Sequence, residues 1–152
     1  MAGILKAILL ASSFAGASHA ETFRDWEVSC VAGTCRAAQT LSAPDRTWLA
    51  TLEAFPKGEG ATLLLRVPLG VHLASGVFVS DGATTLYPAT FTRCETDGCR
   101  AVLDMTPEML AGWRKGTRAQ IRYRPSSDAA VLAFEASLMG VTQALSAAGA
   151  SR

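Results

Sequence analysis

All four cysteines of this 152-residue chain fall within two copies of one short unit. The first copy begins at Cys30-Val31 and the second at Cys94-Glu95, and both have the form Cys-x4-Cys-Arg-Ala with a glycine inside the loop. Four cysteines permit three pairings. The repeated spacing favours the two local ones, Cys30–Cys35 and Cys94–Cys99, each of which would crosslink a tight loop between strands.

A zinc site that uses all four cysteines as ligands is the alternative. Structural zinc sites favour two to four residues between paired cysteines, so the spacing here lies at the edge of that range. Thiolates also persist in reducing compartments, whereas structural disulfides belong to oxidising ones. A thioredoxin-like redox motif would need Cys-x-x-Cys, which this chain does not contain. The choice between disulfides and zinc therefore depends on where the protein resides.

The N-terminus has the features of a secretory signal peptide. Lys6 is followed by an apolar run over 7–17 and by Ser18-His19-Ala20, which has the small-x-small form of a cleavage site. A spanning helix needs about 20 apolar residues, so this run is too short for a membrane anchor. The residue directly after the cleavage site is Glu21 and not cysteine, which argues against a lipoprotein. We therefore expect a signal peptide over 1–20, one domain over 21–152, disulfides, and no transmembrane segment after cleavage.

The net charge of the chain does not favour nucleic acids as partners. The chain has 14 basic and 13 acidic residues, and cleavage after Ala20 removes Lys6 and no acid. The mature chain is then formally neutral, which gives no case for nucleic-acid binding.

Apolar and polar residues alternate along most of the chain, a pattern typical of β-strands. Pro56–Gly60 is a loop by composition, Asp81-Gly82 predicts a two-residue hairpin turn, and Pro88 indicates an edge or a bulge. The clearest strand is 117–124, with four arginine or glutamine side chains on one face and four less polar ones on the other. The expected strands are 25–30, 35–41, 47–55, 63–67, 77–80, 84–94, 99–103, 117–124 and 131–138.

Two short helices complete the expected fold. The first starts at Thr106-Pro107-Glu108, which offers a hydroxyl cap, a proline at the first helical position and an acid in the first turn. It ends at Gly116, and Met109 and Trp113 share its buried face. The second covers about 141–147 before a loose Ala/Gly/Ser tail. Long crossover helices are missing, so the fold class is all-β, an antiparallel sandwich or barrel with one or two short helices.

Residues that could perform catalysis are sparse. The mature chain has one histidine, His72, and no serine in a G-x-S-x-G context. No carboxylate spacing implies a glycosidase pair, no loop is built to cradle phosphate, and no second histidine is available for a metal. We expect no enzymatic activity and no cofactor.

One cluster has possible binding chemistry. No acid occurs between Glu108 and Asp128, and five basic residues lie in that interval. Guanidinium groups on one strand face can hold phosphate or sulfate, so an anionic envelope or host-surface polymer is a candidate partner. A solvated basic sheet face is the simpler interpretation, because a single strand is a small footprint. The candidate anion-binding residues are Arg114, Lys115, Arg118, Arg122 and Arg124.

Several local patterns together resemble the invasion-associated locus B (IalB) family of exported bacterial proteins. In chain order they are Phe23-x-x-Trp26-x-Val28-x-Cys30, Pro68-Leu69-Gly70-Val71, Gly76-Val77, Asp81-Gly82, the loop from Cys94 to Cys99 with Ala101 beyond it, and Ser137-Leu138-Met139-Gly140 running into Ala144-Leu145. The closing segment departs from the family pattern, since an aromatic residue is more usual after the glycine than Val141.

The resemblance implies an envelope protein of a Gram-negative bacterium that is periplasmic, outer-membrane associated or secreted. Pathogenic members of the family are linked to entry into host cells, notably erythrocytes, and no catalytic residues define it. Two classes of function stay open: a non-enzymatic interaction protein, or a small periplasmic hydrolase or small-ligand carrier. The first predicts an exposed binding face, and the second predicts a concave pocket with convergent polar groups.

Overall fold

The computed structural model describes residues 20–150, so the predicted signal peptide lies outside the described residues except for Ala20. Two helices, α1 (Pro107–Lys115) and α2 (Val141–Ala150), and one short 3-10 helix, η1 (Leu73–Ser75), accompany ten strands. The strands are β1 (Glu21–Phe23), β2 (Trp26–Val31), β3 (Thr34–Ser42), β4 (Trp48–Lys57), β5 (Gly60–Val67), β6 (Val77–Ser80), β7 (Leu86–Glu95), β8 (Gly98–Met105), β9 (Arg118–Tyr123) and β10 (Leu132–Ser137).

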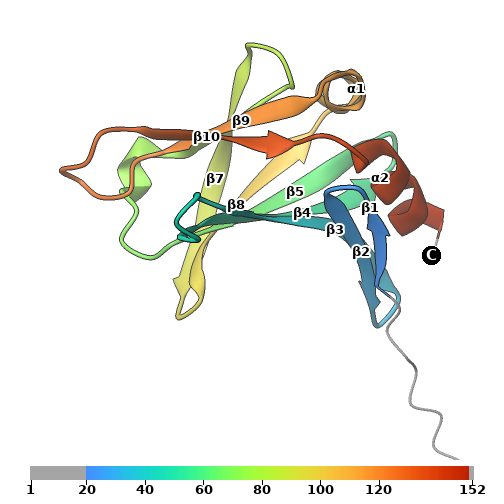
Figure 1. Ribbon diagram of the computed structural model, residues 1–152, viewed down its shortest axis with the longest axis horizontal. Coiled ribbons are helices and arrows are strands. Elements are labelled where there is room, and N and C mark those ends of the chain that lie inside the picture. Colours follow the sequence, from blue (N-terminus) through green and yellow to red (C-terminus); the bar gives the residue numbers. More distant parts are fainter. Residues whose placement is uncertain (1–19, 151–152) are drawn as a thin grey trace, which may run out of the picture.

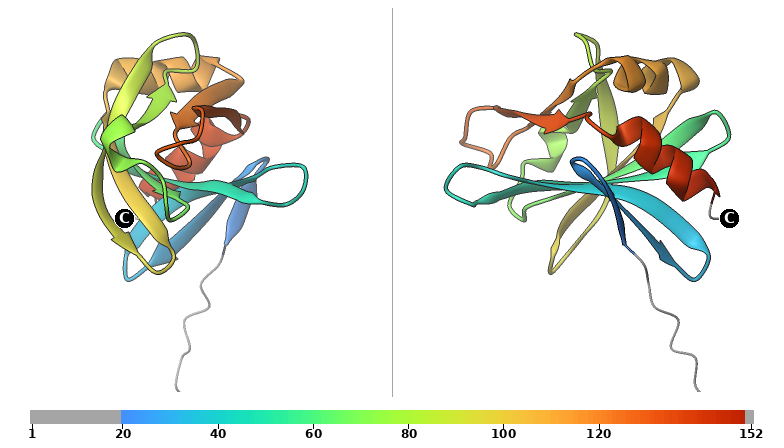
Figure 2. Two further views of the ribbon diagram at one scale, coloured as in Figure 1. Left: turned by 90° about the vertical axis from the view of Figure 1, so that its left-hand side faces the viewer. Right: turned by 45° about the vertical axis from the view of Figure 1, so that its right-hand side comes forward.

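The strands form one sheet in the order β1-β2-β3-β4-β5-β8-β7-β6-β9-β10, and neighbouring strands are antiparallel. The sheet bends over on itself, so that β9 and β10 lie above β3 and β4 as a second layer (Figures 1 and 2). Helix α2 lies against β2, β3 and β4. This arrangement confirms the predicted all-β, sandwich-like fold with two short helices.

Two tryptophans fill the space between the layers. Trp26 of β2 and Trp113 of α1 are both fully buried, and their ring centroids lie 6.1 Å apart. The indole N–H of Trp26 donates to the Ser137 carbonyl at 2.9 Å, and that of Trp113 donates to the Ser80 carbonyl at 2.9 Å. Each buried indole therefore has a partner, as its polar N–H requires, and each ties its element to a distant strand.

The sequence signals for α1 are confirmed. The Thr106 hydroxyl accepts a hydrogen bond from the Met109 N–H at 3.3 Å, Pro107 occupies the first turn, and the helix ends before Gly116. Met109 and Trp113 are both buried, as their spacing predicts. The hydroxyl satisfies one of the helix N–H groups that lack a partner within the helix.

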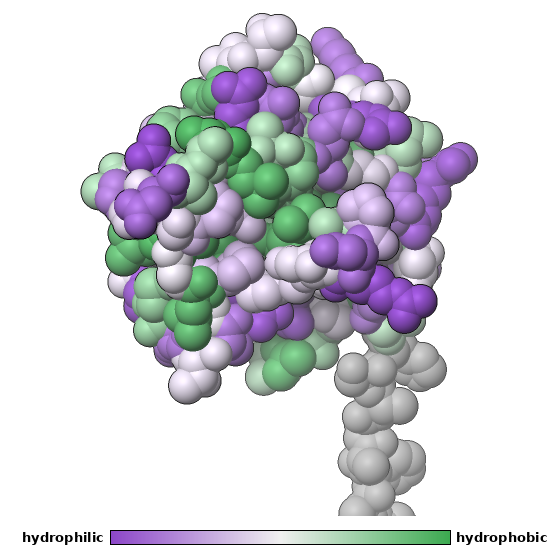
Figure 3. Space-filling model, turned by 60° about the vertical axis from the view of Figure 1, so that its left-hand side comes forward, coloured by the Kyte–Doolittle hydropathy of each residue, from purple (hydrophilic) through white to green (hydrophobic). Residues whose placement is uncertain are grey.

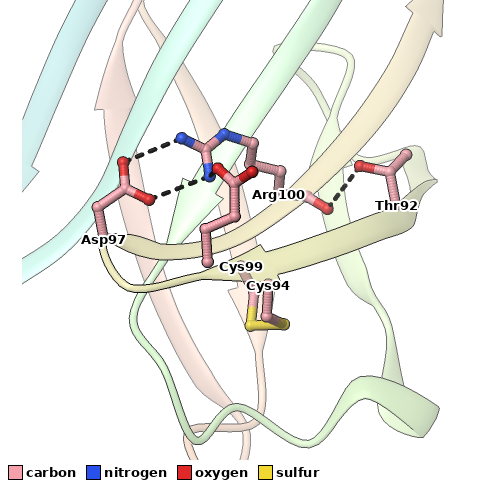
Figure 4. The surroundings of a disulfide bond; sticks show 6 residues. Thr92, Cys94, Asp97, Cys99 and Arg100 are labelled. Atoms are coloured by element: carbon pink, nitrogen blue, oxygen red, sulfur yellow. Dashed lines mark hydrogen bonds and ion pairs between the residues drawn. A yellow bond between two sulfur atoms is a disulfide. The ribbon is translucent and has the colours of Figure 1, made fainter.

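Both predicted disulfides are present. Cys30 faces Cys35 directly across the β2–β3 hairpin, and Cys94 faces Cys99 across the β7–β8 hairpin. Figure 4 shows the second one beside the turn that carries Asp97. Because all four sulfurs are used in these bonds, no thiolate remains for the alternative zinc site.

We expect the double replacement Cys94→Ser, Cys99→Ser to lower the free energy of unfolding by about 2 kcal/mol, because the bond closes a short loop in the unfolded chain. The pair Cys30→Ser, Cys35→Ser closes a loop of the same length and should give a similar loss. Urea denaturation followed by tryptophan fluorescence measures both. An unchanged midpoint in both variants would contradict the crosslinking role.

Two predicted turns are wrong in extent. Pro56 and Lys57 belong to β4 and Gly60 to β5, so the expected loop over 56–60 shrinks to a turn. Pro56 lies beyond Ala54, the last residue of β4 in register with β3. The expected two-residue turn at Asp81-Gly82 is instead a loop over 81–85, closed by a hydrogen bond from the Asp81 N–H to the Thr85 carbonyl at 3.0 Å.

Three further differences concern strand and helix ends. Strand β1 was not expected, and α2 continues to Ala150 where a loose tail was predicted. Pro88 lies in β7, which is an interior strand, but β8 pairs with β7 only from Thr90 onward, so the edge at Pro88 is locally open. The bulge in β7 lies between Phe91 and Arg93 instead. Within residues 20–150, no helix is long and apolar enough to cross a membrane.

Candidate functional site

Strand β9 has the two faces that its sequence predicts. Ala119, Ile121 and Tyr123 are buried in the core, so Arg118 and Arg122 lie on the outer face. The Tyr123 hydroxyl reaches across the core and donates to the Leu49 carbonyl at 2.9 Å, and burial raises the pKa of that phenol. The outer face is therefore fixed in orientation by the packing of the inner one.

The two arginines of this basic face have one partner from β10 and one from β9 itself. A guanidinium nitrogen of Arg118 lies 2.7 Å from a carboxylate oxygen of Glu135, and both side chains are more than half exposed. Arg122 donates from Nε to the Gln120 side-chain carbonyl at 2.5 Å. Sequence reasoning missed Glu135 because it compared residues along the chain, whereas the acid comes from the next strand. The alternation over 131–138 already places Glu135 on the outer face.

Two hollows lie along the outer face of β9. One, of about 300 Å³, is lined by Arg118 and Arg122 together with Ser80 and Leu86. The other, of about 290 Å³, is lined by Arg122 and Arg124 together with Phe78 and Val131. The buried Nε of Arg124 has no hydrogen-bond partner among the described residues. Arg118, Arg122 and Arg124 therefore form a continuous basic surface along the two hollows, which we call the β9 face.

The predicted cluster is only partly assembled. Arg114 and Lys115 are exposed in the last turn of α1, where cations interact favourably with the helix dipole, but they line neither hollow. The cluster that the structure supports is therefore the three-arginine β9 face, with Arg118 neutralised in part by Glu135.

A larger groove, of about 680 Å³, lies between β3 and β10. Its walls include Gln39 and Leu41 on one side and Glu135, Ser137 and Arg118 on the other. Figure 3 shows the molecule with its left-hand side brought forward, where hydrophobic residues gather in the middle of the face and hydrophilic ones surround them. The cysteine repeat gives no indication of this groove, and of the predicted basic cluster Arg118 alone lines it.

A separate group of ion pairs stabilises the loop that the Cys94–Cys99 disulfide closes. The Arg100 guanidinium forms two hydrogen bonds with Asp97, at 2.9 and 3.0 Å, and these bonds lower the pKa of the Asp97 carboxyl (Figure 4). Arg66 of β5 forms an ion pair with Asp97 at 3.0 Å and stacks over Trp48 at 5.2 Å from the ring centroid. The cluster links the β7–β8 turn to β4 and β5, which is a structural role.

His72 lies outside the β9 face. Its ring Nδ1 is 2.6 Å from the Ser75 hydroxyl, three residues along the chain, and its backbone N–H donates to the Arg124 carbonyl at 2.9 Å. These contacts hold η1 against the end of β9. Within residues 20–150, no three histidine, cysteine, aspartate or glutamate side chains are grouped so that they could hold a metal ion.

The fold and the site define a class of protein: a bent antiparallel β domain with two crosslinked hairpins and a basic outer strand face. A family model described as invasion associated locus B (IalB) protein matches residues 26–149. The chain belongs to this family.

The relatives agree with this assignment. Two proteins described as invasion protein B homologs, from Brucella abortus strain 2308 and from Brucella abortus biovar 1 strain 9-941, are each 31% identical to this chain over 132 residues. The matches cover 82% of this chain and 76% of each relative. The crystal structure of invasion associated protein b from Bartonella henselae matches with a TM-score of 0.77 over 88% of this chain and 97% of that one. Sequence identity to it is 17%, so this likeness shows the fold.

Proposed function

We propose that this chain is an exported, non-enzymatic envelope protein of the IalB type that acts by binding, with an anionic polymer or lipid head group as the target of its β9 face. The observation that carries the proposal is the set of three arginines, Arg118, Arg122 and Arg124, that line two neighbouring hollows beside β9, with Arg118 and Arg122 on its outer face. Guanidinium forks match phosphate and sulfate groups in a bidentate manner.

Two lines of support favour export. Both disulfides are of the kind that persists in oxidising compartments such as the periplasm. The N-terminal sequence has a charged start, an apolar run and a small-x-small site before Glu21. The names of the Brucella relatives connect the family with invasion, so a role at the host-cell surface is part of the proposal.

The alternative, a hydrolase or a small-ligand carrier, has less support. A carrier needs a concave pocket with convergent polar groups. Trp26, Trp113 and Leu52 fill the centre of this molecule, and the groove between β3 and β10 lies open at its surface. His72 contacts Ser75 within one short turn and does not line the hollow that contains Arg118. A binding face on the outside of the sheet fits these features better.

The test is binding to heparin and to lipopolysaccharide at low and moderate salt. We expect weak binding at low salt that the triple variant Arg118→Ser, Arg122→Ser, Arg124→Ser reduces about tenfold, since each exposed ion contact contributes about 0.5 kcal/mol or more. Salt should weaken wild-type binding, because exposed charges are screened within about 8 Å at physiological ionic strength.

The matched control removes three exposed charges elsewhere, with Arg46→Ser, Lys57→Ser and Arg93→Ser. This variant has the same net charge as the first and should keep most of the binding. If the folded β9-face variant binds as well as wild type, or if wild type fails to bind at low salt, the face is only a solvated sheet surface.

A further inference from the structure

Among residues 20–150, β10 is the last strand of the sheet, and its edge away from β9 pairs with no further strand. Its pairing with β9 is regular from Leu132 opposite Tyr123 to Ser137 opposite Arg118. The N–H and the carbonyl of Ser137 both bond to partners away from β9, and the next N–H, that of Leu138, turns back to the Thr117 carbonyl at 2.9 Å. In an antiparallel strand, both backbone groups of a residue point to one side and alternate along the chain. Ala133 and Glu135 therefore also direct their backbone groups to the free edge.

The side chain of Gln39 imitates a strand at this edge. Its carbonyl oxygen accepts from the Ser137 N–H at 3.1 Å, and its amide nitrogen donates to the Ser137 carbonyl at 3.2 Å. A residue of a neighbouring strand would make the same pair of bonds. Gln39 is 7% exposed, and its amide nitrogen also donates to the Asp25 carbonyl at 3.0 Å. These contacts hold the Gln39 side chain in place against Ser137. The edge is thus satisfied at Ser137, and within residues 20–150 the backbone groups of Ala133 and Glu135 that point to this edge pair with no further strand.

Of these two positions, Glu135 lines the 680 Å³ groove, and Ala133 lies two residues further along β10, beyond the lining. Pairing of β2 with β3 stops at Ala38, so β3 continues past its neighbour and contributes Thr40 and Leu41 to the opposite wall. Leu41 and Phe134 pack only partly buried against the margin of the core. The space between β3 and β10 is therefore bordered by backbone hydrogen-bonding groups and by apolar side chains that are not fully covered.

We propose that the groove accepts an extended peptide segment of a partner protein, which adds to β10 as a further strand. An unpaired strand edge is a template for another strand, and such addition takes its affinity from backbone bonds and its specificity from alternate side chains. Side chains that face inward would cover Phe134 and Leu41 and should be apolar. The groove is lined by two acids, Asp25 and Glu135, and one base, Arg118, so a basic outward side chain is favoured.

This site is distinct from the β9 face in chemistry, because it selects a strand with a positive charge and not an anion. Only Arg118 and Glu135 are common to the groove and the hollows beside β9. Loss of heparin binding in the triple arginine variant therefore leaves the peptide proposal standing, and the reverse also holds.

The first experiment measures amide hydrogen exchange by NMR in wild-type protein with two synthetic peptides. The basic probe is acetyl-Thr-Val-Lys-Val-Lys-Val-Thr-amide, and the acidic probe has Glu in place of each Lys. We expect the basic probe at millimolar concentration to slow exchange of the Ala133 and Glu135 N–H groups at least tenfold, with weaker protection by the acidic probe. Ser137 should change little, because its N–H is already bonded. Absence of protection at Ala133 and Glu135 with both probes overturns the proposal.

The peptide control is the basic probe with every amide N-methylated, which keeps the side chains and removes the donors. Equal binding of this control would show that side-chain contact alone drives binding, and the strand proposal would be wrong. Protection of the same amides that rises with protein concentration in the absence of peptide would identify a second copy of this chain as the occupant, which also overturns the assignment to a partner.

A variant test uses Ala133→Pro against Ala133→Ser. Proline removes the N–H that faces the free edge and is tolerated at such positions, whereas serine keeps the N–H. We expect Ala133→Pro to weaken binding of the basic probe at least tenfold and Ala133→Ser to leave it nearly unchanged. If Ala133→Pro fails to fold by near-UV circular dichroism, Glu135→Lys replaces it and should reverse the preference toward the acidic probe. A retained preference for the basic probe would contradict the charge assignment.

Discussion

Replacing Trp26 with alanine is expected to lower the free energy of unfolding by about 3–5 kcal/mol, the range for removal of a fully buried aromatic side chain. Trp26 is 0% exposed, packs 6.1 Å from Trp113 between ring centroids, and donates to the Ser137 carbonyl at 2.9 Å. The change leaves a cavity between the two layers and removes one of the bonds that hold β10 over β2. Chemical denaturation followed by circular dichroism measures the loss.

Trp48→Ala is the matched control. This indole lies half-buried on the outer face of β4, where it stacks with Arg66 and donates to the Thr51 hydroxyl at 3.1 Å. Because part of the ring is already in contact with water, we expect a loss of only about 1 kcal/mol. Equal losses for the two tryptophan variants would show that the centre of the molecule is less tightly packed than the structure indicates.

Gly112→Ala is expected to destabilise the protein by about 1–3 kcal/mol, although alanine is the better helix former by about 1 kcal/mol. Gly112 lies in the middle of α1, and a Cβ added there would be 2.3 Å from the backbone carbonyl oxygen of Asp81. The Asp81 carbonyl belongs to the backbone of the β6–β7 loop, which cannot move aside as the end of a flexible side chain could. The helix must therefore move away from the sheet that holds Trp113.

Gly149→Ala is the same change in the other helix and has the opposite expectation. The nearest atoms to its added Cβ belong to the Pro56 ring at 3.8 Å or more, which is ordinary van der Waals contact. Helix propensity then dominates, and we expect a gain of up to about 1 kcal/mol. Thermal or urea denaturation of the two variants compares them directly. Stabilisation by both replacements would contradict the close approach of α1 to the β6–β7 loop.

Only part of the β9 face could be predicted from the sequence. Alternation over 117–124 correctly placed Arg118 and Arg122 outside and Ile121 inside, because the two faces of a strand differ by one residue. It could not reveal that Glu135 pairs with Arg118, since that contact depends on which strand lies beside β9. The groove between β3 and β10 was missed entirely, as its walls are far apart in the chain.

Local features of this protein follow from residues that are close in the chain: the strand faces, the start and end of α1, and the two disulfides between residues that face each other across a hairpin. These depend on interactions between residues close in the chain. The strand order, the close approach of Gly112 to Asp81 and the bridge from Gln39 to Ser137 become visible only in the folded molecule. Each of these depends on how the bent sheet folds back over itself. That bend brings together residues that are far apart in the chain, and a local sequence pattern carries no information about such contacts.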